Sequence, residues 1–110
     1  MPDPIEPMVD DIVRRIIKTV QPTRIVLFGS AARGTFHDDG HDTSDLDFLV
    51  IMPAGTHRRD TARAIERALR EVGIPKDVVV VTEDDVITHR DNPSLVIKPA
   101  LDEGREVYAA

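Results

Sequence analysis

Two short stretches constrain the fold of this chain more than any other part of it. They are Leu27–Ser30, which reads Leu-Phe-Gly-Ser, and Asp45–Asp47, which reads Asp-Leu-Asp. The residues 24–28 have the pattern of a buried strand that breaks at the Gly-Ser pair, and the residues 45–51 have the pattern of a second strand. Successive side chains alternate across a strand, so both aspartates point to one face, about 7 Å apart. The fold must therefore place two carboxylates together at the start of a strand.

These paired aspartates allow two interpretations. Neighbouring carboxylates repel, and the pKa of one would rise unless a positive charge compensated. A divalent metal compensates well, because Mg²⁺ is usually held by one or two carboxylates together with substrate phosphates. The alternative is a solvent-facing strand end with a polar edge. The uninterrupted apolar run Phe48–Ile51 favours the metal, because it indicates a strand covered on both faces, where unused acids are costly.

The composition restricts the class of protein. A chain of 110 residues predicts one domain, residues 1–110, with one modest core, and 4% aromatic content without tryptophan makes that core aliphatic. The absence of cysteine excludes disulfides and thiolate metal sites. The start Met1–Pro4 lacks the pattern of a signal peptide, and no apolar run is long enough for a membrane span. We therefore expect a cytoplasmic protein that does not bind membranes.

The net charge of −6 bears on the partners of the chain. It argues against stable, direct binding to a nucleic-acid backbone. It is compatible with a basic protein partner, or with one local site for a metal and a nucleotide.

The order of periodic segments predicts a small α/β (α+β) protein. We expect helices at 6–20 and 56–72, main strands at 24–28, 45–51 and 77–82, further helical segments after Thr82 and from Asn92, and a short edge strand at 105–108. Gly73 should stop the second helix, the run 82–85 should form a capping box, and Pro99 should kink or divide the last helical stretch. The expected architecture is a small mixed sheet of three main strands flanked by helices.

The strand order places a third carboxylate near the pair. Strand 45–51, helix 56–72 and strand 77–82 form a βαβ unit, so the two strands should be parallel with a right-handed crossover. Both strands then start at one edge of the sheet, where Asp77 joins the pair. Strand 24–28 must run antiparallel to strand 45–51 for its Gly-Ser turn to reach the same edge. Three carboxylates and this turn predict a metal and phosphate site.

At this point the residues resemble a known family. The motifs are Leu27–Gly34, Ser44–Val50, Asp77 and the closing run Glu103–Tyr108. Together they resemble the polymerase-β-like nucleotidyltransferases, and the compact size is similar to the minimal nucleotidyltransferases (MNT), which occur in prokaryotes beside HEPN-domain proteins. The likeness covers roughly residues 12–108 and implies a polymerase-β-like nucleotidyltransferase core.

Two features depart from the family pattern. The gap between Ser30 and Asp45 is longer than usual, and His37–Asp42 looks like the extra length. Ala31 stands where many members carry a basic or larger residue, although Arg33 matches.

The resemblance implies metal-dependent transfer of AMP from ATP to a hydroxyl group, with pyrophosphate leaving. Asp45 and Asp47 would hold Mg²⁺ on the triphosphate, and Asp77 would complete the site of a second Mg²⁺ beside the attacking hydroxyl and help to remove its proton. The remaining site residues would serve the phosphates: Gly29 by close backbone approach, Ser30 by a hydrogen bond, and Arg33 by a weaker contact.

The resemblance also implies a partner. Members of the MNT family act as antitoxins in HEPN/MNT toxin–antitoxin pairs, so the acceptor would be a hydroxyl, on a tyrosine, of a HEPN ribonuclease toxin, with which the chain could form a hetero-oligomer. Two alternatives stay open. One is a binding module that neutralises its partner by contact alone, and the other is transfer to a small molecule such as an aminoglycoside. Enzymes of the latter kind generally carry a further domain for the acceptor.

Other polar segments have simpler interpretations. His37 and His41 lie among aspartates and could be read as a metal cluster, but a polar loop around Gly40 is normally just solvated. The arginines of helix 56–72 could bind RNA or an acidic partner, whereas a solvated helix face is the plainer interpretation in so acidic a chain.

Overall fold

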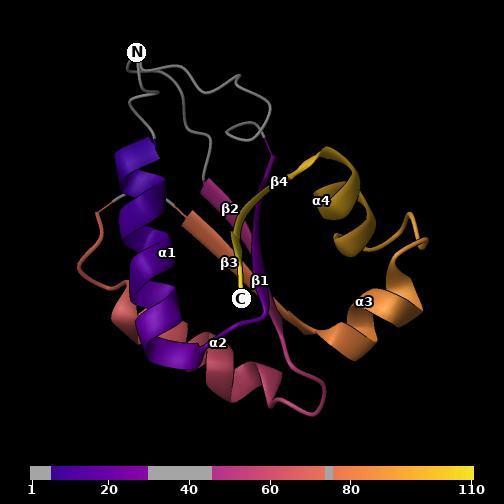
Figure 1. Cartoon of the computed structure of the whole chain (residues 1–110), viewed down its shortest axis with the longest axis horizontal. Helices are drawn as coiled ribbons and strands as arrows, with labels where there is room; N and C mark the ends of the chain where they lie inside the picture. The colour runs from indigo at the N-terminus through magenta and orange to yellow at the C-terminus, as the bar shows by residue number, and fades with distance from the viewer. Residues whose placement is uncertain (1–5, 30–45, 74–75) are drawn as a thin grey trace.

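The computed structural model describes residues 6–29, 46–73 and 76–110. In chain order their elements are α1 (Glu6–Val20), β1 (Arg24–Phe28), β2 (Leu46–Met52), α2 (Arg58–Ala68), β3 (Lys76–Thr82), α3 (Glu83–His89), α4 (Ile97–Glu103) and β4 (Arg105–Ala109). Figure 1 shows the strands in the middle of the molecule, with α1 and α2 on one side and α3 and α4 on the other. Within the described ranges, every helix is too short or too polar to cross a membrane.

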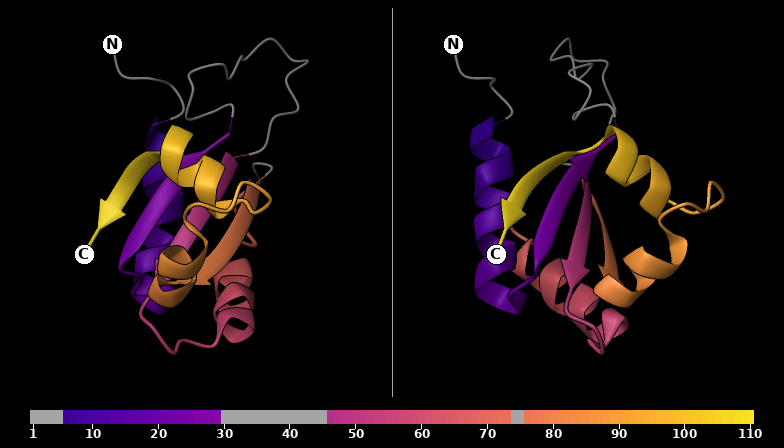
Figure 2. Two further views of the ribbon diagram at one scale, coloured as in Figure 1. Left: turned by 90° about the vertical axis from the view of Figure 1, so that its right-hand side faces the viewer. Right: turned by 45° about the vertical axis from the view of Figure 1, so that its right-hand side comes forward.

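The four strands form one mixed sheet in the order β3-β2-β1-β4. Strands β2 and β3 are parallel, as predicted for a βαβ unit. Strand β1 is antiparallel to both of its neighbours, which confirms the predicted direction of the first strand relative to the second. Figure 2 shows the four strands side by side, with β3 and β4 at the two outer edges.

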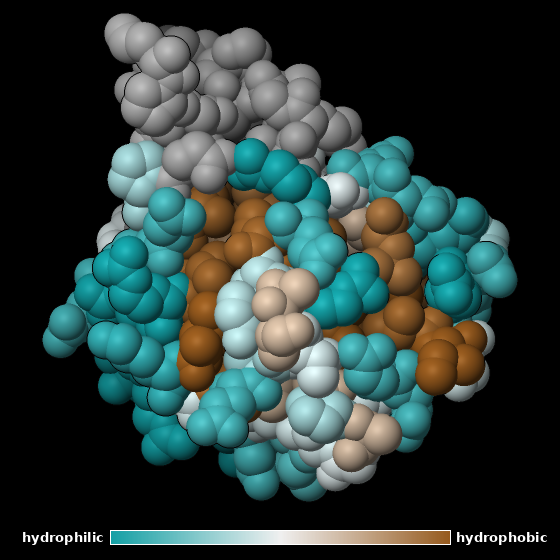
Figure 3. Space-filling view, in the orientation of Figure 1, coloured by the Kyte–Doolittle hydropathy of each residue, from teal (hydrophilic) through white to brown (hydrophobic). Residues whose placement is uncertain are grey.

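Strand β2 is buried on both faces, as its apolar run predicts. Its side chains alternate between two hydrophobic clusters, one under α1 and α2 and the other under α3 and α4. Leu46, Phe48, Val50 and Met52 join the first cluster, and Leu49 and Ile51 join the second. Figure 3 shows apolar side chains in two separate bands, one between α1 and β4 and one beside α3 and α4. The sheet therefore has a core on each side.

Most predicted boundaries agree with the structure to within a residue or two. Helix α1 and strand β1 have the predicted bounds, β2 ends one residue later, at Met52, and β3 begins one residue earlier, at Lys76. The predicted short edge strand is present as β4 and extends to Ala109.

Helix α2 is shorter than the predicted 56–72. His57 is its N-cap, and the ring Nδ1 accepts a hydrogen bond of 3.2 Å from the backbone N–H of Asp60. The helix therefore begins at Arg58, two residues after the predicted start. At the other end Leu69 is the C-cap, and tight turns follow, including a 3.0 Å bond from the Val72 N–H to the Leu69 carbonyl. Gly73 comes after these turns, so the prediction that it stops the helix was wrong.

Pro99 neither kinks nor divides a helix. Helix α4 begins at Ile97, so Pro99 lies in its first turn, where a backbone N–H has no partner within the helix. The predicted start at Asn92 was also wrong. The side chain of Asn92 accepts a 3.0 Å hydrogen bond from the Ser94 N–H, which favours a turn at this position rather than a helix.

The predicted capping box of α3 is present. The Asp85 N–H donates to Thr82 Oγ1 at 3.2 Å, and the Thr82 N–H donates to Asp85 Oδ2 at 3.0 Å. Arg58 of α2 adds a 3.1 Å bond to the same carboxylate oxygen. Partial burial alone would raise the pKa of Asp85, but the Thr82 backbone, the Thr82 side chain and the Arg58 guanidinium outweigh it and hold this pKa below its ordinary value.

This capping box predicts a pH-dependent contribution to stability. A carboxyl group whose pKa is lowered by folding stabilises the fold above its unfolded pKa of about 3.9, and this contribution is lost as the pH falls through the folded-state value. Asp85→Ala should therefore lower the free energy of unfolding by about 1 kcal/mol at neutral pH, and the difference from wild type should narrow below pH of about 4. Urea unfolding across this pH range measures both effects.

The matched control is Asp84→Ala in the same helical turn, where the side chain is exposed. This substitution should lower the free energy of unfolding by at most about 0.5 kcal/mol, because it changes only the interaction with the helix dipole. Equal losses for the two variants would contradict the role given to the capping box.

Candidate functional site

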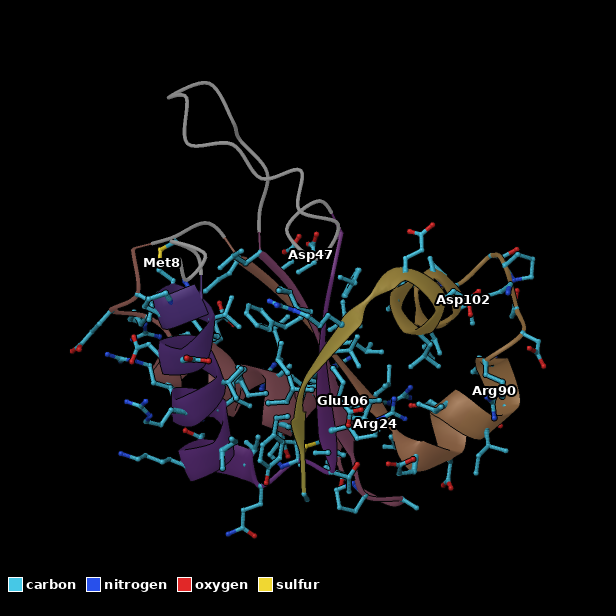
Figure 4. The ribbon with its side chains drawn as sticks, turned by 45° about the horizontal axis from the view of Figure 1, so that its top comes forward. Met8, Arg24, Asp47, Arg90, Asp102 and Glu106 are labelled. Atoms are coloured by element: carbon cyan, nitrogen blue, oxygen red, sulfur yellow. The ribbon has the colours of Figure 1, made fainter. Side chains whose placement is uncertain are left out.

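Two of the predicted aspartates lie next to each other at one edge of the sheet. In the parallel pair, Asp47 of β2 is directly opposite Asp77 of β3, and on its other side Asp47 is opposite Phe28 of β1. Neighbouring strands lie about 4.8 Å apart, and paired residues project to the same face. That face is the one covered by α3 and α4, because Leu49 belongs to the cluster on that side. Figure 4 shows Asp47 at the end of the sheet where β2 begins.

The two carboxylates differ in their exposure. Asp47 is partly buried, whereas Asp77 is exposed. Asp77 also lines a surface hollow beside α2, together with Lys76 and Arg70. The Asp47 carboxylate therefore lies within the edge of the sheet, whereas Asp77 lies at its exposed rim, beside the hollow.

Gly29 is held against the carboxylate of Asp47. It follows the last residue of β1 and has a φ of +80°, a backbone conformation that favours glycine. A Cβ atom added at this position would overlap Oδ2 of Asp47 and lie 3.4 Å from its Cγ. A side chain at this position would force the Asp47 carboxylate to move. The end of β1, the start of β2 and the start of β3 therefore meet at one place.

The predicted convergence at this edge is confirmed for the residues that the structure describes, namely Gly29, Asp47 and Asp77. Three other predicted site residues, Ser30, Arg33 and Asp45, lie outside the described residues, as do Ala31 and the loop His37–Asp42. Within the described ranges, no three acidic or histidine side chains are close enough together to hold a metal ion. The predicted three-carboxylate set depends on Asp45, and the roles assigned to all six residues stay predictions.

One residue that supports this edge was not predicted from the sequence. Gly104 is the C-cap of α4, and its backbone N–H donates a 2.9 Å hydrogen bond to the Ala100 carbonyl. An added Cβ at Gly104 would also lie 2.6 Å from Val26 Cγ1 and 2.9 Å from the Leu27 carbonyl oxygen. The end of α4 is thus packed tightly against β1, two residues before Gly29. A glycine directly between a helix and a strand is the sequence signal for such packing.

The comparisons with known proteins agree with this geometry. Residues 9–107 match the family model described as "Nucleotidyltransferase domain". The chain belongs to this nucleotidyltransferase family. No curated protein sequence matches it.

Three solved structures share the fold. One, described as that of a proposed nucleotidyltransferase from Sulfolobus solfataricus, has a TM-score of 0.60 and 18% identity, covering 94% of this chain and 78% of that one. A toxin–antitoxin structure, a mutant of MntA-HpeT, has a TM-score of 0.56 and 18% identity, covering 92% of this chain and 72% of that one. A toxin–antitoxin structure with AMP-PNP has a TM-score of 0.56 and 20% identity, and the match covers 92% of this chain and 73% of that one. At these identities the likeness establishes the fold.

The close approach of Gly29 can be tested against a matched glycine. Gly55 has a φ of +86° but has no atom within 4 Å of an added Cβ. Alanine at either position should cost about 1–2 kcal/mol of unfolding free energy from the backbone conformation. Only Gly29→Ala should also displace Asp47 and weaken binding of a labelled nucleotide, by at least about tenfold.

Thermal unfolding and fluorescence titration of the two variants measure these effects. If Gly29→Ala and Gly55→Ala lost the same stability and both kept nucleotide binding, the contact between Gly29 and Asp47 would have no role in the site.

Proposed function

We propose that this chain transfers AMP from ATP to a hydroxyl group of a HEPN-type toxin, in a metal-dependent reaction, and acts as the antitoxin of that pair. The observation that carries the proposal is the direct pairing of Asp47 with Asp77, with Gly29 packed against the Asp47 carboxylate. In a chain of the nucleotidyltransferase family, this arrangement supports a site for a triphosphate and an acceptor.

The residues at this edge suit Mg²⁺. Two carboxylates on adjacent strands, one of them open to solvent, provide the hard oxygen ligands that Mg²⁺ takes, and its remaining positions are normally filled by phosphates and water. We propose that Asp45, Asp47 and Asp77 hold two such ions. Bound there, Mg²⁺ would neutralise charge on the phosphates and on the attacking and leaving oxygens.

The chain's own residues would then have distinct roles. Asp77 would accept the proton of the acceptor hydroxyl, whose oxygen attacks the α-phosphorus of ATP. The bond from the α-phosphorus to the bridging oxygen breaks, and pyrophosphate leaves. Gly29 would let the backbone approach the triphosphate, with Ser30 and Arg33 as further phosphate contacts. Asp47, fixed by the buried strand β2, would keep the site in place.

The choice of partner rests on the structural relatives and on charge. Two of the relatives are described as toxin–antitoxin structures, one with AMP-PNP and the other a mutant with two aspartate-to-glutamate substitutions two positions apart. Asp45 and Asp47 have the same spacing. A net charge of −6 suits a basic ribonuclease partner, and the absence of cysteine suits the cytoplasm. We propose that residues 1–110 act as one domain in this complex.

Replacing either described carboxylate should abolish transfer. Asp47→Asn and Asp77→Asn each remove a negative ligand with little change in shape, so the rate of AMP transfer should fall at least about 100-fold, the upper range for disturbed metal sites. The measurement is the incorporation of label from α-labelled ATP into the protein encoded by the neighbouring gene. The control is Asp102→Asn on α4, whose side chain pairs with Lys98 at 2.8 Å.

The same variants separate the competing functions. If both asparagine variants neutralised the toxin as well as wild type, the chain would act by contact alone and the enzymatic proposal would be wrong. Transfer to a free aminoglycoside, with no label on the neighbouring protein, would instead identify a small-molecule acceptor.

Removal of the metal should have a separate, measurable effect. With a chelator present, ATP should no longer raise the melting temperature of the wild-type chain, because the triphosphate would lose its link to the carboxylates. Added Mg²⁺ should restore the increase in wild type and in Asp102→Asn, but not in Asp47→Asn. If ATP raised the melting temperature equally with and without metal, the proposed metal site would be contradicted.

A further inference from the structure

Strand β3 has a free edge in the part of the chain that the structure describes. It pairs along its whole length with β2, from Lys76 opposite Leu46 to Thr82 opposite Met52, and it is the outermost strand of the sheet (Figure 2). Its backbone groups on the outer side form a row of donors and acceptors without a neighbouring strand. Such an edge can accept a further strand from another protein.

A groove runs along this edge between β3 and α2. One hollow of about 640 Å³ is lined by Thr56, His57, Arg58, Arg59, Ala62 and Val80. A second, of about 450 Å³, shares Ala62 and contains Val78 and Leu69. Both hollows border Ala62 and strand β3, and each has a valine of that strand in its lining; together they make up the groove.

The second hollow ends at the proposed active site. Its lining includes Asp77, which lies next to Asp47, together with Lys76 and Arg70. A segment lying along the groove would therefore pass beside Asp77, the residue that we assign to the acceptor hydroxyl.

The groove is basic in an otherwise acidic chain. The residues 56–76 contain six basic and three acidic side chains, whereas the rest of the chain contains eight basic and seventeen acidic ones. The two hollows are lined by four basic side chains and two acidic ones (Arg58, Arg59, Arg70 and Lys76; Glu66 and Asp77). Arg58 is already paired with Asp85, but Arg59 and Arg70 are exposed. The partner that fits this surface carries negative charge.

We infer that this groove binds an extended, acidic segment of the acceptor protein, which pairs with the free edge of β3 as a fifth strand. Val78, Val80 and α2 lie on one face of the sheet, so every second side chain of the segment would point to that face. Apolar side chains there would contact the two valines, and acidic ones would face Arg59 and Arg70. The delivery of the acceptor hydroxyl to Asp77 rests on the proposed function, whereas the binding itself does not.

Two other occupants fit the groove less well. The lining of the two hollows includes no Phe, Tyr or Trp on which a base could stack, and its one imidazole, His57, already accepts a hydrogen bond from the Asp60 N–H. Because the whole chain is also acidic, RNA is disfavoured. A second copy paired through β3 would bring two basic α2 surfaces together, which is electrostatically unfavourable.

The test is an NMR titration of the ¹⁵N-labelled full chain without ATP. The probe is a peptide of about ten residues in which valine and glutamate take turns on one strand face, with threonine on the other face and one tyrosine, added to concentrations on the order of 1 mM. Amide signals of β3 and α2 should shift. Binding should be at least about tenfold weaker for the same peptide with lysine in place of glutamate, and for a peptide N-methylated at alternate residues, which cannot pair as a strand.

Matched variants locate the groove on the protein. Arg59→Glu combined with Arg70→Glu should weaken binding of the acidic peptide at least about tenfold, while Arg90→Glu at the end of α3, labelled in Figure 4, should leave it unchanged. Asp47→Asn should also bind the peptide normally. The inference would be overturned if the acidic peptide caused no shifts, or if the lysine or N-methylated peptides bound equally well. It would also be overturned if a single-stranded RNA shifted the same signals, or if the chain self-associated through β3.

The outcomes are separable from those of the proposed function. If the peptide binds at β3 but no AMP reaches any protein acceptor, the docking groove stands and the enzymatic proposal fails. If AMP is transferred to the partner but no peptide shifts β3, only the docking inference fails.

Discussion

The structure depends on the register of β2 within the sheet. Phe48 and Val50 are fully buried on one face of this strand, and Leu49 and Ile51 are fully buried on the other. A slip of one residue would exchange the two faces, moving every one of these side chains into the wrong cluster and Asp47 to the other side of the sheet. Core packing thus fixes, without any ligand, which carboxylate lies opposite Asp77.

The glycines on either side of this edge show how tightly it is built. Gly29 lets the end of β1 approach the Asp47 carboxylate, and Gly104 lets the end of α4 approach β1 just before that point. A side chain at Gly104 would collide with backbone atoms, and one at Gly29 would displace the Asp47 carboxylate, so the site is packed from two directions. Such pre-positioned carboxylates avoid a cost of rearrangement when a charged substrate binds.

Much of this could be predicted from the sequence, because local periodicity and topology point the same way. The apolar run of β2 predicted burial on both faces, and the βαβ order predicted that Asp47 and Asp77 meet. The end of α2 could not be predicted, because residues 69–72 are good helix formers that leave the helix through tight turns. The position of Pro99 depended on where α4 begins, and the contact of Gly104 with β1 depended on tertiary packing.

The proposed function depends on Asp47 and Asp77 holding the same metal-bound triphosphate. The most direct measurement is a crystal structure of the chain with Mn²⁺ and a non-hydrolysable ATP analogue, with the metal located by its anomalous signal. We predict metal density within about 2.1 Å of oxygens from both carboxylates and from the phosphates. A metal bound elsewhere, or a nucleotide bound with Asp77 turned away from it, would contradict the account.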